Sequence, residues 1–135
     1  MNKEELDGYL KEIGGLQRTY REDKGPILDA GYFGVKEGWY GIIKDLISEL
    51  IENGWDRRIV QVKEKFGVLS FYTEKLPESS YDILSKYIIK SSHTCDICGK
   101  EGELRRGNWW RTRCDEHSDG MEPFDKEQMK RMFNR

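Results

Sequence analysis

The sequence predicts an α+β fold for this chain of 135 residues. One long segment places apolar residues at helical spacing, and two neighbouring runs of β-branched and aromatic residues flank a glycine. These observations predict a small helix–β-hairpin–helix body over residues 1–92, in which residues 1–38 are an N-terminal arm and a Gly-rich loop. Closely spaced Cys and His pairs predict a separate module over residues 93–120, followed by a short tail helix over residues 121–135.

Composition limits the class of protein. Charged residues make up 36% of the chain, and no apolar run approaches the ~20 residues that span a membrane. The first residues have no apolar stretch behind a basic start, so we expect a soluble cytoplasmic protein without a membrane partner. The three cysteines are an odd number, and all lie between residues 95 and 114. Both facts favour metal binding over disulfides.

The first helix is expected over residues 4–13, where apolar residues recur at spacings of three and four: Leu6, Tyr9, Leu10 and Ile13. Two glycines follow and are expected to end it. Residues 14–38 show no sustained periodicity and predict an ordered or partly ordered loop. Loops longer than ~12–15 residues are uncommon inside compact domains and are often functional.

The second helix has the clearest pattern in the chain. Its apolar residues continue along one face through about four turns: Trp39, Ile42, Ile43, Leu46, Ile47, Leu50 and Ile51. Asn53 and Gly54 come next, and both tolerate the left-handed backbone that ends many helices.

A hairpin and a third helix complete the predicted body. Residues 59–62 and 68–73 are β-rich runs that flank a turn over residues 63–67. After Pro77, Ser79 or Ser80 is expected to cap a helix. Its apolar face is expected to consist of Tyr81, Leu84, Tyr87 and Ile88.

The Cys and His pairs predict a structural zinc site. Cys95-x2-Cys98 and Cys114-x2-His117 are separated by fifteen residues and supply three thiolates and one imidazole, the ligands that tetrahedral zinc prefers. Two short strands around Gly107-Asn108 would bring both pairs together as a zinc ribbon. Four protein ligands leave no position for substrate. His93 is the alternative ligand, but it breaks the paired spacing and is expected to end the preceding helix.

The predicted ribbon hairpin is rich in arginine and tryptophan. Residues 57–114 carry an excess of basic over acidic residues. One interpretation is a nucleic-acid or partner contact, in which guanidinium groups hold phosphates and indoles stack on bases. The other, which we favour, is that the arginines pair with neighbouring acids and one indole packs against the body. The residues concerned are Arg105, Arg106, Trp109, Trp110, Arg111 and Arg113.

The predicted turn of the body hairpin carries Lys63, Glu64 and Lys65 beside Phe66. These residues form either a tip that contacts a partner or a solvated turn that stabilises the local fold.

Three stretches of the chain carry a resemblance. They are Gly38-Trp39-Tyr40, the core VKEKFG-x-L-x-F-Y over residues 62–72, and the ribbon ligands. In this order they resemble a widespread family of uncharacterised phage and prophage proteins, over about residues 35–118. The family often has Gly-Leu-Arg where this chain has Val68-Leu69-Ser70, so no role of that arginine transfers here. The resemblance implies no established activity; it implies a phage-encoded accessory protein of the bacterial cytoplasm.

We therefore expect a non-enzymatic protein that binds, and modulates or inhibits, a bacterial host protein. The alternative is a nucleic-acid-binding accessory protein that uses the zinc hairpin. An enzyme built on the Gly-rich loop is a third hypothesis, but it has His93 as its sole base and no recognisable nucleophile. The tail has an apolar stripe that would pack on the body or on a second copy in a homo-oligomer: Phe124, Met129, Met132 and Phe133.

Overall fold

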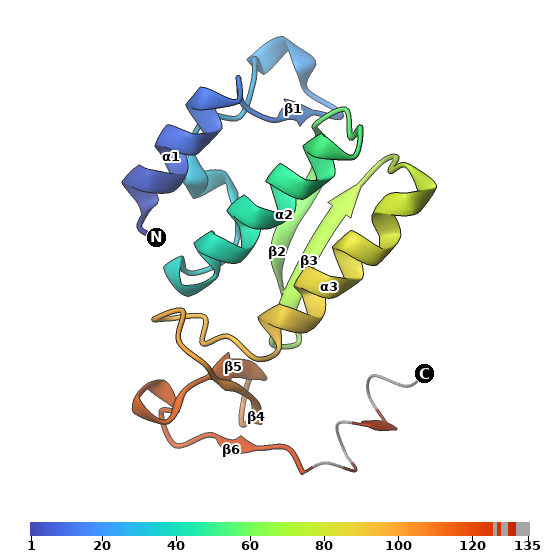
Figure 1. Cartoon of the computed structure of the whole chain (residues 1–135). Helices are drawn as coiled ribbons and strands as arrows, with labels where there is room; N and C mark the ends of the chain where they lie inside the picture. Colours follow the sequence, from blue (N-terminus) through green and yellow to red (C-terminus); the bar gives the residue numbers. More distant parts are fainter. Residues whose placement is uncertain (126, 128–129, 132–135) are drawn as a thin grey trace.

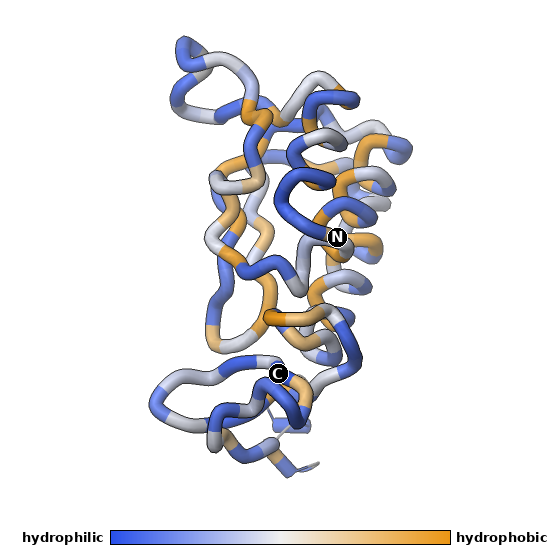
Figure 2. Tube along the Cα trace, turned by 90° about the vertical axis from the view of Figure 1, so that its left-hand side faces the viewer, coloured by the Kyte–Doolittle hydropathy of each residue, from blue (hydrophilic) through white to orange (hydrophobic). Residues whose placement is uncertain are grey.

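The computed structural model describes residues 1–125, 127, 130 and 131. Within them the chain has the predicted α+β fold, with helices and two small sheets. Figure 1 shows helices α1 (Lys3–Glu12), α2 (Tyr40–Glu52) and α3 (Tyr81–Ser91) with the first sheet as one body, and the second sheet beyond the end of α3. Figure 2 shows that hydrophobic residues gather along the body and are sparse around the second sheet.

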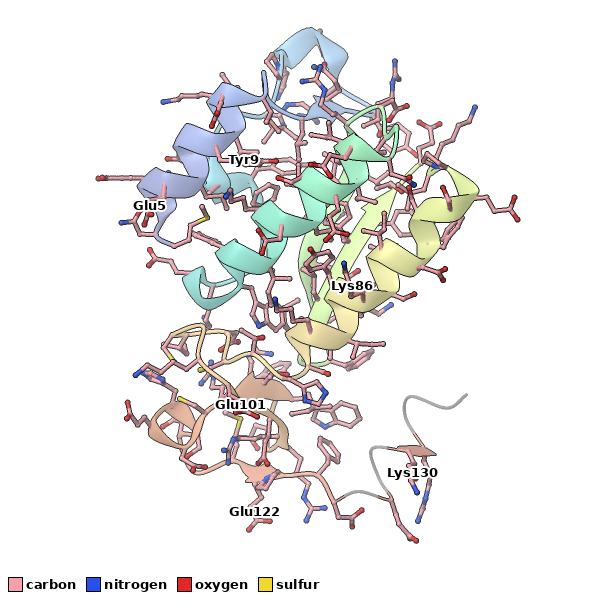
Figure 3. All side chains as sticks on the ribbon, viewed as in Figure 1. Glu5, Tyr9, Lys86, Glu101, Glu122 and Lys130 are labelled. Carbon is pink, nitrogen blue, oxygen red and sulfur yellow. The ribbon has the colours of Figure 1, made fainter. Side chains whose placement is uncertain are left out.

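Helix α1 is part of the body core. Asn2 caps it through a capping box with Glu5, which satisfies two backbone N–H groups. Leu6 and Leu10 are completely buried. The Tyr9 hydroxyl lies 2.6 Å from the Ser48 hydroxyl of α2, between the two helices in Figure 3. The predicted helix is therefore present, and its apolar face packs against α2.

The segment from residue 14 to residue 38 is an ordered loop with short elements that the sequence did not predict. Strand β1 (Gln17–Arg18) pairs in parallel with β2 (Arg58–Lys65), and Gly34 forms a further bridge to Lys63. Two 3₁₀ turns, Glu22–Lys24 and Ala30–Tyr32, lie between these contacts, and a third, Glu37–Trp39, follows Gly34 and leads into α2. Pairings of one or two residues are too short to leave a periodic pattern, which is why the sequence indicated only a loop.

Helix α2 lies between α1 and α3 and forms the centre of the core (Figure 1). Its predicted apolar face is confirmed. Ile43, Leu46, Ile47 and Leu50 are completely buried, and Ile51 is partly buried. Trp39, just before the helix, is also completely buried.

The body hairpin is antiparallel as predicted, but its turn lies later in the chain. Residues 63–65 continue β2 and pair with Ser70, Leu69 and Val68 of β3 (Val68–Thr73). The turn consists of Phe66 and Gly67, with φ angles of 52° and 84°. Two residues with positive φ match the twist of the flanking strands. The prediction of a turn at Lys63–Lys65 is therefore wrong, because backbone pairing outweighs the charged character of that segment.

Helix α3 begins differently from the prediction. Ser80 is its N-cap residue but makes no side-chain capping bond. Instead, the Asn53 amide donates to the hydroxyls of Ser79 and Ser80, each at 2.8 Å, and so joins the end of α2 to the start of α3. Tyr87 is buried as expected, whereas Tyr81 is 57% exposed and does not belong to the packed face.

The second sheet contains the predicted ribbon hairpin and one unexpected strand. Strands β4 (Glu103–Arg106) and β5 (Arg111–Arg113) are antiparallel, and β6 (Glu122–Pro123) pairs with the other edge of β4. A tail helix starting at residue 121 is therefore wrong for its first residues. Further on, Glu127, Lys130 and Arg131 are helical, whereas the predicted apolar positions Met129, Met132 and Phe133 lie outside the described residues. No helix of the described part is long and apolar enough to cross a membrane.

Candidate metal centre

The four predicted ligands come together in one cluster. Cys95 and Cys98 lie on the turn after α3, and Cys114 and His117 lie on the turn after β5. One ligand atom from each residue lies within 4.8 Å of all the others. The Cys98 and Cys114 sulfurs are 3.7 Å apart, and His117 Nδ1 is 3.2 Å from the Cys114 sulfur. Tetrahedral Zn–S bonds of about 2.3 Å separate two sulfurs by about 3.8 Å. The cluster can therefore hold one metal ion.

Backbone N–H groups point at the buried sulfur of the first turn. Burial raises the pKa of the Cys95 thiol, but N–H groups of Cys114, Cys98 and Ile97 outweigh this effect and lower it to about 7. Gly99, with φ of 79°, lets the chain fold back so that its N–H donates to the Cys95 carbonyl at 2.9 Å. The turn thus favours the thiolate that a metal ion needs.

The second thiol behaves in the opposite way. A backbone hydrogen bond from Lys100 lowers the pKa of Cys98, but desolvation and the neighbouring sulfurs of Cys114 and Cys95 outweigh it, so the pKa is raised. Thiolates this close repel one another unless a cation lies between them. The donor set is therefore compatible with zinc, which binds thiolate and imidazole together.

The ribbon hairpin positions the two halves of the cluster. Glu103 pairs with Arg113, which brings the second turn back beside the first. The Asp96 N–H donates to the Thr112 carbonyl at 3.0 Å, and the Cys95 N–H donates to the Lys100 carbonyl at 2.8 Å. These bonds hold both turns at the same end of the sheet, as the sequence predicted.

Arg105 is a buried structural residue of the ribbon. Only 5% of it is exposed. Its guanidinium donates to the Arg113 carbonyl at 2.9 Å and to the Asp115 carboxylate at 2.8 Å. A third bond, 3.4 Å long, reaches the carbonyl of Met121. Arg105 therefore links β4 to β5, to the second metal-binding turn and to the segment before β6, and the structure does not place it at a contact surface.

The other predicted contact residues are divided between internal pairs and the surface. Arg113 pairs with Asp96 at 3.0 Å, Arg111 with Glu64 at 3.0 Å, and Arg106 with Glu122 at 3.5 Å. These pairs agree with the interpretation in which the arginines find acidic neighbours. Lys63, Lys65 and Trp109 are exposed. His93 is exposed and does not belong to the metal cluster.

The ribbon packs directly against the start of α2. The Gly38 N–H donates to the Asp96 carbonyl at 2.9 Å, and the Trp39 indole N–H donates to the Thr94 carbonyl at 2.8 Å. A Cβ atom at residue 38 would lie 2.2 Å from the Cys95 carbonyl oxygen. Glycine is required there because the metal-binding turn approaches the backbone of the body so closely.

The ribbon also packs against the tip of the body hairpin. The Thr112 hydroxyl donates to the Gly67 carbonyl at 2.8 Å in a buried bond. Glu64 accepts a hydrogen bond from the Gly67 N–H and pairs with Arg111 across the junction. Trp110 lies with its ring centroid 5.8 Å from that of Phe66. The hairpin tip thus packs against the ribbon and supports it. Neither interpretation of the charged residues Lys63, Glu64 and Lys65 included this role.

The sequence missed the residues that join body and ribbon: Gly38, Trp39, Gly67 and Thr112. Gly38 and Trp39 were assigned to a loop and to a helix face, and Gly67 to a turn. Each fits its local pattern and makes a second contact far away in the sequence. The local signal was limited to a glycine directly before a tryptophan, and a second glycine in the turn.

Comparison with known proteins found no relative of this chain. No protein-family model matches it, and no curated protein and no solved structure matches it.

Proposed function

We propose that the chain is a zinc protein in which the metal is structural, and that it acts by binding rather than by catalysis. The observation that carries this proposal is the cluster of four ligand atoms within 4.8 Å of one another. Four protein ligands complete a tetrahedral shell, so substrate has no open position on the metal. The cluster instead holds together the two ligand turns, of which the first contacts the body where the Asp96 carbonyl accepts from the Gly38 N–H.

The metal itself is tested by stoichiometry. One zinc ion per chain is expected by elemental analysis of protein purified without chelator. His117→Ala should lower zinc affinity at least tenfold, because it removes one of four ligands. The matched control is His93→Ala, which changes the other histidine of the chain and should keep full occupancy. Equal zinc content in both variants would contradict this ligand set.

As the partner we propose a bacterial host protein, which the chain modulates or inhibits in the cytoplasm. An exposed aromatic cluster at the junction supports a protein partner. Phe66, 67% exposed, contacts Trp110, and Trp110 contacts Phe124 with ring centroids 5.0 Å apart. Aromatic residues are enriched at protein interfaces because they bury a large area with few rotatable bonds.

This partner class is tested by tagged capture from a bacterial lysate with and without nuclease. A defined host protein should be captured in both conditions, and Phe66→Ala should reduce its recovery severalfold. Tyr81→Ala is the matched control, since Tyr81 is a similarly exposed aromatic residue at the start of α3. Loss of capture after nuclease treatment, or equal loss in the control variant, would contradict the proposal.

A nucleic-acid-binding accessory protein is the second candidate function. One specific observation favours it, a cleft at the junction that is lined by Lys36, Arg111 and Arg113 beside an exposed indole. This cleft is lined by charged residues, whereas the aromatic cluster consists of Phe66, Trp110 and Phe124. The two candidate functions therefore predict that different substitutions abolish binding.

A further inference from the structure

A cleft of about 310 Å³ lies where the body meets the ribbon. Lys36, from the loop before α2, lines its body side. The ribbon side is lined by Asn108, Trp109, Arg111, Arg113 and Asp119. Its volume falls at the lower end of the range for small-molecule sites, about 300–1,000 Å³. The cleft exists only when the two modules are docked, because each supplies one side.

The charges on this cleft favour an anion. Lys36, Arg111 and Arg113 contribute three cations, and Asp119 contributes one carboxylate. Two further carboxylates, Glu64 and Asp96, line the neighbouring cavity, which also includes Lys36 and Arg111. Both are already paired, Glu64 with Arg111 and Asp96 with Arg113.

These pairs orient the guanidinium groups without using all their donors. Arg113 donates to Asp96 through Nε at 3.0 Å. A guanidinium has five N–H donors in one plane. Its terminal nitrogens have no hydrogen-bond acceptor among the described side chains and backbone, and the same holds for the Lys36 ammonium. The cleft therefore presents guanidinium donors that are oriented by their ion pairs, together with the Lys36 ammonium, and both kinds of group suit phosphate oxygens.

Trp109 differs from the neighbouring tryptophan. Trp110 packs between Phe66 and Phe124, whereas Trp109 is 72% exposed and makes no ring contact within the described residues. An exposed indole beside cations is the arrangement on which proteins stack nucleobases. Asn108, in the same lining, adds an amide that can donate and accept hydrogen bonds.

We propose that this cleft binds one nucleotide unit, with the base stacked on Trp109 and the phosphate held by Lys36, Arg111 and Arg113. The inference rests on the second candidate function and names the ligand chemistry for it. A phosphoserine or phosphothreonine side chain would use the cations but would leave the indole without a planar partner. Both single-stranded nucleic acid and a free nucleotide contain a base and a phosphate, so either could bind in this way.

The test measures binding of fluorescein-labelled dT12 and rU12 to the zinc-loaded chain by fluorescence anisotropy, at two salt concentrations. Trp109→Ala should weaken binding about tenfold or more, because stacking contributes about 1–3 kcal/mol per base. Trp109→Phe should retain most of the affinity. Lys36→Ala should weaken binding a few fold and reduce the salt slope by about one, as expected for one phosphate contact.

Matched controls are residues of the same type outside the cleft. Tyr20→Ala removes an aromatic ring that is 82% exposed in the loop after β1, and Lys75→Ala removes an exposed lysine after β3. Neither should change the affinity. Equal weakening by these controls, unchanged binding by Trp109→Ala, or no binding of either oligonucleotide or ATP at low salt would overturn the proposal.

Competition separates the two sources of the ligand. If ATP displaces dT12 at concentrations near its own affinity, the site takes a free nucleotide; if only oligonucleotides bind, it takes a strand. Failure here is distinguishable from failure of the host-protein proposal, since capture of a host protein after nuclease treatment depends on Phe66 and not on Trp109.

Discussion

The body and the ribbon are stabilised by different kinds of interaction. The body buries a continuous apolar cluster in which Trp39, Leu46 and Ile59 are at most 1% exposed. The ribbon buries Cys95 and Leu104 as its hydrophobic residues, beside polar groups such as Arg105 and Thr112. Its described core is too small to offset the entropy of ordering its backbone. We therefore expect the ribbon to depend on the metal ion that we propose and on its contacts with the body.

Metal removal should give the largest difference between the two regions. With chelator, or in Cys98→Ser, we expect the ribbon over residues 93–124 to lose its amide protection while α2 and β2 retain theirs. Structural zinc contributes about 10 kcal/mol or more to small domains, far more than any single contact at the junction. Hydrogen exchange read by mass spectrometry reports each segment separately. Unchanged exchange and thermal melting after zinc removal would contradict a structural metal.

A core substitution should destabilise the body. Leu46→Ala creates a cavity at a completely buried position of α2, and such changes cost about 2–5 kcal/mol. Urea unfolding followed by circular dichroism should show a lower midpoint. Ile89→Ala is the matched control on α3, where the side chain is mostly exposed, and should shift the midpoint little. Zinc stoichiometry should stay at one per chain in both variants unless the body has unfolded.

The junction should be the next most sensitive feature. Gly38→Ala would force a Cβ atom into the backbone of the metal-binding turn, and overpacking of this kind costs about 1–3 kcal/mol. We expect faster exchange at residues 94–96 and little change in α1. Gly41→Ala is the control, because a Cβ there meets no atom within 4 Å. If the amides of residues 94–96 exchange at the same rate in both variants, the ribbon does not approach the body as closely as the structure shows.

The smallest expected effect is an electrostatic one between α2 and α3. Hydrogen bonds from Lys86 and Tyr87 lower the pKa of Glu49, and Lys86 Nζ lies 2.8 Å from the carboxylate between the two helices (Figure 3). A carboxyl whose pKa is lowered by folding adds stability above its unfolded pKa, and loses it as pH falls through the folded value. Glu49→Gln should therefore lower the urea midpoint slightly at pH 7.

The difference between Glu49→Gln and the parent chain should disappear in acid, where both side chains are neutral. Glu52→Gln, an exposed change at the end of the same helix, is the control and should lack this pH dependence. A Glu49→Gln effect of the same size at pH 3 and pH 7 would show that packing, not charge, links the helices.

Much of the local structure could be predicted from the sequence. The apolar period of residues 39–51 identified α2, and the β-rich runs around Gly67 identified the hairpin. The predictions were wrong where a residue's local conformational preference was overridden by a contact with a residue far away in the sequence. Ser80 was expected to cap α3, yet its hydroxyl accepts from Asn53, and Pro123 was expected in a helix, yet its segment pairs with β4. Pairings between segments far apart in sequence leave no period or spacing to detect.

The metal ligands and the junction show the same division. The sequence by itself determined the four ligands, because two x2 spacings allow only a tight turn to bring each pair together. Only the tertiary structure decided that Gly38, Gly67 and Thr112 join the ribbon to the body, and that Lys36 and Trp109 share one cleft. The physical reason is that ligand spacing is a property of a short chain segment. Docking depends instead on how closely two separately folded backbones can approach.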